Sequence, residues 1–100
     1  MAREAIHPGE FLADELGEIE ITATELSRQI DVPPNRISQI IHAKRDITAD
    51  TALRLGKFFG TGPELWINLQ KTYDLDKARA EMGAKLQKIH QWQTDAHVAG

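Results

Sequence analysis

Apolar residues recur every three or four positions along most of this chain, which is the spacing of one face of an α-helix. Leu12, Leu16 and Ile19 form one such stripe, and they predict a first helix over residues 7–19. No segment alternates apolar and polar residues with the period of two that marks a half-buried β-strand. We therefore expect an all-α protein with a single core, as suits a chain of 100 residues.

Two short helices joined by a tight turn are predicted over residues 22–42. Thr22, followed three residues later by Glu25, forms a capping box that marks the start of the first of them. The run DVPP at 31–34 must end this helix, because a residue that precedes proline avoids the α-helical conformation. The next helix keeps its apolar residues on one side and its polar residues on the other. This arrangement indicates a helix-turn-helix, whose second helix enters the major groove of DNA.

Two more helices and a C-terminal helix are predicted beyond this unit. Thr48 caps the fourth helix, Gly60 ends it, and a fifth helix begins at Pro63. Asp74 stands where it would cap a separate helix over residues 75–92. We expect the apolar stripe of that helix to form the seam of a homodimer, with packing across the fourth and fifth helices of the same chain as the alternative. The stripe consists of Leu75, Ala78, Met82, Leu86 and Ile89.

Charge is distributed unevenly along the chain, although the net charge is only −3. Residues 1–27 carry one base and seven acids, residues 28–57 carry six bases and three acids, and the remainder is balanced. The basic stretch therefore coincides with the predicted helix-turn-helix. A local patch of this kind neutralises DNA phosphates even in a protein that is acidic overall.

Several classes of function are not expected from the composition. The chain has no cysteine, and its four histidines are not spaced as metal ligands, so we expect no disulfide, no metal and no cofactor. No nucleophile–base set and no glycine-rich phosphate loop occurs, so an enzyme is not expected. There is no apolar run long enough for a signal peptide or a membrane span, and we expect a cytoplasmic protein.

The third helix carries the polar residues that could read DNA bases. Asn35 and Gln39 lie four positions apart on its exposed face, and the amide of either can bond an adenine edge twice. Arg36 suits a guanine edge or a phosphate, whereas Arg54 suits either a phosphate or an ion pair with Asp50. The expected base-reading set is Asn35, Arg36, Ser38 and Gln39, and the expected phosphate-binding set is Arg28, Lys44, Arg45 and Thr48.

Three segments carry a resemblance to one group of bacterial regulators: HPGEFLADEL (7–16), VPPNRISQII (32–41) and KRDITADTALRLGKFFGTGPELWINLQKTYDL (44–75). They are similar to the HigA-type antitoxins, also called the VapI group, within the lambda-repressor-like, XRE-type helix-turn-helix class. The resemblance implies a lambda-repressor-like domain of five helices and a homodimer on a palindromic operator. It further implies repression of the protein's own operon and a cognate RelE-like, HigB-like toxin that cleaves mRNA.

The acidic first segment is the candidate contact surface for such a toxin. Toxins of this group are typically small and basic, so Asp14, Glu15 and Glu18 would attract one electrostatically. The other interpretation is a solvated acidic face that prevents incorrect docking on DNA. Two further functions remain open: a stand-alone regulator without a toxin, and a protein-interaction module whose DNA-binding face is degenerate.

Overall fold

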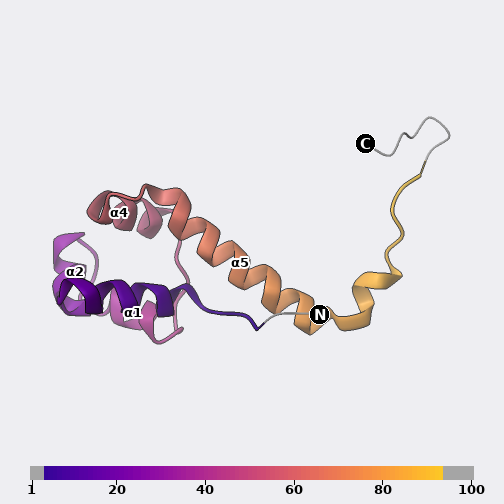
Figure 1. The fold of residues 1–100 in the computed structure, drawn as a ribbon, viewed down its shortest axis with the longest axis horizontal. Coiled ribbons are helices and arrows are strands. Elements are labelled where there is room, and N and C mark those ends of the chain that lie inside the picture. Colours follow the sequence, from indigo (N-terminus) through magenta and orange to yellow (C-terminus); the bar gives the residue numbers. More distant parts are fainter. Residues whose placement is uncertain (1–3, 94–100) are drawn as a thin grey trace.

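The regular structure of the protein is helical, as its computed structural model shows over the described residues 4–93 (Figure 1). The prediction of an all-α fold with five helices is confirmed, and no strand occurs in that range. None of the helices within it is long and apolar enough to cross a membrane. The helices are α1 (Pro8–Ile19), α2 (Ala23–Gln29), α3 (Arg36–Ile41), α4 (Ala49–Phe59) and α5 (Pro63–Met82), followed by a 3-10 helix, η1 (Gly83–Lys88).

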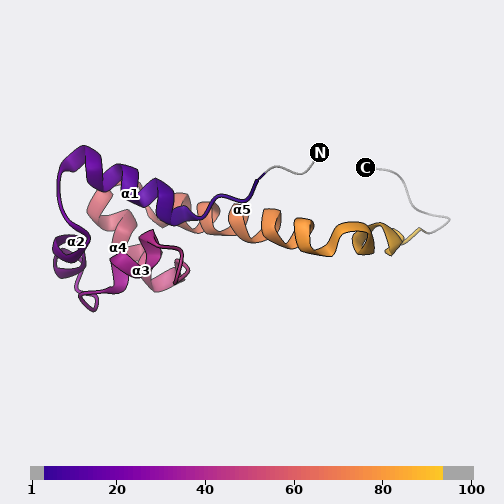
Figure 2. The ribbon, with the colours of Figure 1, turned by 90° about the horizontal axis from the view of Figure 1, so that it is seen from below.

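The first four helices and the beginning of α5 form a head, from which the rest of α5 projects (Figures 1 and 2). The molecule is therefore elongated, with extents of 58, 26 and 22 Å. Trp66, near the start of α5, is fully buried, and its Nε1 donates a hydrogen bond to Thr61 Oγ1 over 3.0 Å. The other large side chains that are fully buried in this core include Leu12, Leu26, Ile37, Ile40 and Leu55.

Backbone contacts fix the head at two points. A Cβ atom added to Gly9 on α1 would lie 2.0 Å from the carbonyl oxygen of Ile40 on α3. A Cβ atom added to Gly56 on α4 would lie 2.3 Å from the carbonyl carbon of Gly62, next to the start of α5. Only glycine allows helices to approach so closely. The first contact seats α3 on α1, and the second fixes the direction in which α5 leaves the head.

The predicted separate helix over 75–92 is wrong in its boundaries. Residue Asp74 lies inside α5 rather than at a cap. Its Oδ1 accepts a hydrogen bond from Gln70 Nε2, one turn earlier in the helix, over 3.0 Å. Gln70 is itself held by the backbone N–H of Ile47, which donates to its Oε1 over 2.7 Å. The helix continues to Met82 and ends at Gly83, whose φ of 53° breaks the helical path.

The residues of the predicted dimer seam therefore lie on three different elements. Leu75, Ala78 and Met82 belong to α5, Leu86 belongs to η1, and Ile89 follows η1 in extended backbone. Their side chains do not pack across α4 and the first half of α5, which was the alternative within one chain. Leu75, Leu86 and Ile89 are instead exposed in the described chain, by 51%, 47% and 68%.

Candidate nucleic-acid interface

The predicted helix-turn-helix is formed by α2 and α3. Thr22 caps α2, as its Oγ1 accepts a hydrogen bond from the N–H of Glu25 over 3.0 Å. The turn passes through Asp31 in the left-handed conformation, with a φ of 59°. Ser27 is fully buried between the two helices, and its Oγ accepts a hydrogen bond from the N–H of Ile37 over 3.4 Å. A small residue at this position lets α3 cross α2 closely.

Arg54 on α4 holds the end of α2. Its Nη1 donates to the carbonyl oxygens of Ile30 and Asp31 over 2.8 and 3.1 Å, and its Nε donates to Asp50 Oδ1 over 2.7 Å. The hydrogen bond that Arg54 donates to Asp50 raises the pKa of Arg54 above its ordinary value. Of the two roles that the sequence left open, the structure places Arg54 in the ion pair, and its guanidinium also fixes the turn before the recognition helix.

The recognition helix α3 begins at Arg36, so Asn35, the first residue of the predicted base-reading set, precedes the helix. Asn35 is its N-cap residue, is exposed, and makes no capping hydrogen bond with its side chain. Its amide therefore remains available for DNA. Arg36, Ser38 and Gln39 lie within α3 and are half-buried. All four residues belong to α3 or to its N-cap, and Figure 2 shows α3 on the lower side of the head.

The loop after α3 contacts the recognition helix through Arg45. Its Nε donates a hydrogen bond to Gln39 Oε1 over 2.8 Å, which sets the orientation of that amide. A hollow of about 300 Å³ lies beside this pair, lined by Ser38, Gln39, His42 and Lys44. His42 is the residue of this hollow that the sequence did not single out. Its position four residues after Ser38, on the same helical face, was the available signal.

The four residues expected at phosphates differ in their surroundings. Lys44 and Arg45 are exposed in the loop that follows α3, and Thr48 is the exposed N-cap of α4. Arg28 is also exposed, but its guanidinium is bonded to both carboxylate oxygens of Glu25, with Nε at 3.1 Å from Oε1. The hydrogen bond lowers the pKa of Glu25 and raises that of Arg28. Arg28 therefore has a competing partner within the chain.

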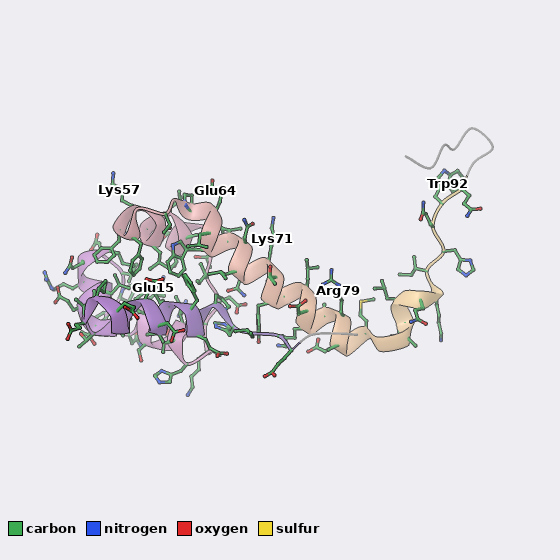
Figure 3. The ribbon with its side chains drawn as sticks, viewed as in Figure 1. Glu15, Lys57, Glu64, Lys71, Arg79 and Trp92 are labelled. Atoms are coloured by element: carbon green, nitrogen blue, oxygen red, sulfur yellow. The ribbon has the colours of Figure 1, made fainter. Side chains whose placement is uncertain are left out.

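The acidic residues expected at the toxin surface follow one side of α1. Asp14 and Glu18 are exposed, and Glu15, labelled in Figure 3, is half-buried. Within residues 4–93, no group of three histidine or acidic residues could hold a metal ion. The chemistry that the described residues offer is therefore polar recognition by α3 and its loop at one surface, and acidic charge at another.

Comparison with known proteins shows the family to which this chain belongs. A model described as helix-turn-helix matches residues 12–66. Virulence-associated protein I of Dichelobacter nodosus is 45% identical over 78 residues, which span 77% of this chain and 72% of that protein.

Solved structures agree in fold along nearly the whole chain. An addiction module antidote protein of the HigA family from Coxiella burnetii is 46% identical with a TM-score of 0.86, over 90% of this chain and all (100%) of that one. The antitoxin HigA of Pseudomonas aeruginosa, solved with the higBA promoter, is 38% identical with a TM-score of 0.84 over the same shares, 90% and 100%. The chain therefore belongs to the helix-turn-helix family, in the group of the HigA-type antitoxins.

Proposed function

We propose that this protein is a dimeric repressor that binds a palindromic operator in its own promoter and neutralises a basic, RelE-like toxin. The observation that carries the DNA-binding part is the polar face of α3, where Asn35 is exposed and Gln39 is half-buried and bonded to Arg45 of the basic loop. That a HigA antitoxin of the same fold was solved with a promoter supports it.

Base reading is assigned to α3 and phosphate binding to its flanks. The free amide of Asn35 and the oriented amide of Gln39 present donors and acceptors to base edges, and Arg36 suits a guanine. Lys44 and Arg45 follow directly and would neutralise phosphates on either side of the groove. One helix reads only a few base pairs, so two copies on a palindrome, about 34 Å or one DNA turn apart, are needed for selectivity.

Toxin neutralisation is assigned to the acidic side of α1. Helix α1, which carries Asp14, Glu15 and Glu18, lies on the upper side of the head in Figure 2 and α3 on the lower side, so one molecule could bind DNA and a basic protein at different surfaces. Acidic charge would both speed the encounter with such a toxin and exclude DNA from this face.

An electrophoretic mobility shift with the protein's own promoter tests the proposal. We expect a complex with the promoter fragment that resists a hundredfold excess of scrambled DNA, and loss of that selectivity in Asn35→Ala and Gln39→Ala variants. Lys71→Ala, which removes an exposed cation on α5, is the control. Absence of a selective complex would instead favour an interaction module with a degenerate DNA-binding face.

A reading frame next to this one separates the repressor–antitoxin from a stand-alone regulator. If that frame encodes a small basic protein, its co-expression with this chain should relieve growth arrest. If no such neighbour exists, the toxin-binding part of the proposal fails while the DNA-binding part stands.

A further inference from the structure

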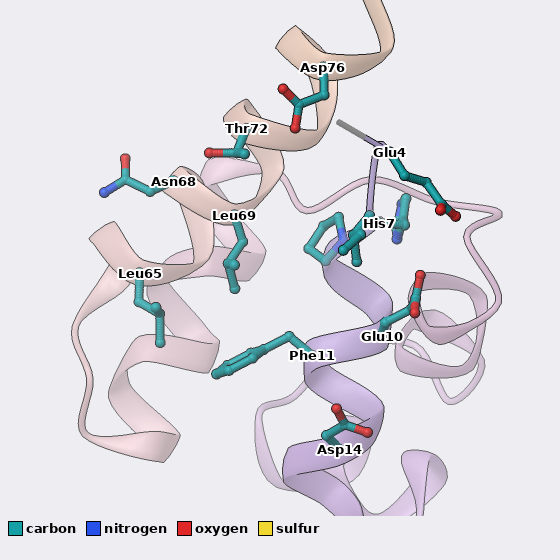
Figure 4. Close-up of a pocket in the computed structure, with 12 residues that line it drawn as sticks. Glu4, His7, Glu10, Phe11, Asp14, Leu65, Asn68, Leu69, Thr72 and Asp76 are labelled. Atoms are coloured by element: carbon teal, nitrogen blue, oxygen red, sulfur yellow. The ribbon is translucent and has the colours of Figure 1, made fainter. Parts of the chain in front are cut away.

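An open groove with an apolar floor and an acidic rim lies between α1 and α5 (Figure 4). Its volume is about 590 Å³. Phe11 from α1 and Leu65 and Leu69 from α5 line the floor, and all three are half-buried. Glu10 and Asp14 stand along its α1 side, where both are exposed. The groove therefore suits a segment that combines apolar side chains with positive charge.

The C-terminal arm, residues 83–93, is a segment of this kind. Trp92, Ile89 and Leu86 on the arm are exposed by 79%, 68% and 47%, and nothing in the described chain covers them. Lys85 and Lys88 give the arm a positive charge, and it contains no acid. The arm and the groove thus have complementary charge and complementary apolar surface.

The groove of the same chain is not where the arm lies. Helix α5 continues without a break to Met82 and carries the arm away from the head, and Trp92 is far from α1 (Figures 1 and 3). We propose that the groove between α1 and α5 receives the C-terminal arm of a second copy of this chain, in a reciprocal exchange. The inference rests on the homodimer in the proposed function and names the surface that completes it. It assigns Asp14 to the dimer, which leaves Glu15 and Glu18 for the toxin.

The lengths of the elements allow this exchange. If two α5 helices cross antiparallel at Ala78, the arm of each copy runs back along the first half of its partner's α5. From Ala78 to Leu86 the chain advances along α5 by at most roughly 14 Å, because Gly83 turns η1 off the axis of α5. Leu69 lies about 13.5 Å from Ala78 in the opposite direction along α5. Leu86 of one copy therefore comes near the level of the groove floor of the other, and the extended backbone that follows η1 is long enough to reach it.

Site-specific crosslinking tests the exchange, and the absence of cysteine in the chain makes every introduced thiol unique. One preparation carries Ile6→Cys at the groove and the other carries Ile89→Cys on the arm. The two are mixed, allowed to exchange subunits, and treated with a short bismaleimide. The matched control replaces the first with Leu53→Cys on α4, because Ile6 and Leu53 are both 60% exposed.

We expect a crosslinked dimer from the Ile6→Cys and Ile89→Cys mixture and at most a tenth as much from the control. Crosslinking of Ile89→Cys with itself would mean that the two arms pair with one another, and would overturn the inference. A dimer without any crosslink would also overturn it, whereas the proposed repressor dimer would stand. A chain that is monomeric throughout would contradict both.

Charge reversal gives an independent readout in the unlabelled protein. The double variant Lys85→Glu and Lys88→Glu should weaken dimerisation about tenfold, because two exposed charges then meet a rim of like sign. Adding Glu10→Lys and Asp14→Lys should restore the dimer dissociation constant to within about threefold of the original. Lys57→Glu, an exposed lysine outside the arm, is the control. Failure of the groove substitutions to restore dimerisation would contradict the pairing.

Discussion

Arg45 donates a hydrogen bond from its Nε to Gln39 Oε1 over 2.8 Å, so a loop residue orients an amide on the recognition helix. A free glutamine can turn its amide over and present donor and acceptor in either order. With Oε1 facing Arg45, the Nε2 donors of Gln39 are left for the base edge that we propose Gln39 to read. Arg45 is thus assigned a positioning role in addition to its expected contact with phosphate.

Replacing Arg45 by methionine should therefore change specificity and not only affinity. We expect discrimination at the base pair read by Gln39 to fall about tenfold, because a well-oriented side-chain pair is worth roughly 1–3 kcal/mol against the wrong base. Binding to a panel of single-base operator variants measures this. Lys44→Met is the control, since loss of a phosphate contact weakens all variants alike and lowers the salt slope by about one. If Arg45→Met behaves in the same way, Arg45 has no positioning role.

The ion pair between Arg28 and Glu25 on α2 predicts that removing the charge of Glu25 raises the affinity for DNA. Glu25→Gln keeps the capping box but frees Arg28 from its carboxylate partner. If Arg28 faces a phosphate, binding to the operator should tighten, and the slope of log K against log salt should steepen by about 0.9. Fluorescence anisotropy over a series of salt concentrations measures both. An unchanged slope would remove Arg28 from the phosphate-binding set.

The backbone contact between α1 and α3 predicts opposite effects for two glycines on one helix. Gly9→Ala would force α3 away, because no side chain can move to relieve a contact with the Ile40 backbone. We expect it to lower the free energy of unfolding by about 3 kcal/mol or to prevent folding. Gly17→Ala has no atom within 4 Å of the new Cβ and should stabilise the protein by roughly 0.5–1 kcal/mol. Urea denaturation measures the free energy of unfolding of both variants, provided that the m-value is unchanged.

The seam on α5 predicts a monomeric variant. Met82→Glu places a charge in the apolar stripe, and an unpaired charge buried between two helices is strongly unfavourable. We expect light scattering at micromolar concentration to give the mass of one chain, with an unchanged helical circular dichroism spectrum. Ala80→Glu, on an exposed position of α5 outside the stripe, should remain dimeric. A Met82→Glu protein that stays dimeric would refute the seam.

The acidic side of α1 predicts that toxin binding and DNA binding can be separated. Glu15→Lys and Glu18→Lys together should weaken binding of a basic toxin about tenfold, because opposite charges are replaced by like ones. Selectivity for the operator over scrambled DNA should be retained. Calorimetry with the purified toxin tests this, and Glu64→Lys with Glu81→Lys makes the same change of charge elsewhere. Equal losses in the two double variants would show that only net charge matters.

The helix-turn-helix could be predicted from sequence because its determinants are local. The cap at Thr22, the left-handed Asp31 and the apolar spacing of α3 all act within a few residues of one another. The start of α3 at Arg36 was harder to predict from the sequence, because Asn35 is an N-cap residue whose side chain makes no capping hydrogen bond. The site residues assigned to bases and phosphates stay predictions, and they lie on α2, on α3 and its N-cap, in the loop after α3 and at the N-cap of α4.

The features that were missed depend on residues far apart in the sequence. Aspartate is a common helix-cap residue, so Asp74 was predicted as a cap. Nothing near it in the sequence indicates that Gln70 is bonded both to Asp74 and to the backbone of Ile47. Likewise, the bond from Arg54 to the carbonyl of Asp31 spans 23 residues. Local patterns cannot distinguish an aspartate that begins a helix from one that supports its interior, because tertiary partners decide between them.

Gly83 ends α5, so a substitution at this one position could change the shape of the molecule during evolution. Its φ of 53° and ψ of −125° suit glycine alone, yet no atom lies within 4 Å of a Cβ at this position. Residues 84–88 are all strong helix formers, so Gly83→Ala would favour joining α5 and η1 into one rod. A single nucleotide change can therefore exchange an arm for a rod in a descendant of this chain, and leave every residue assigned to DNA untouched.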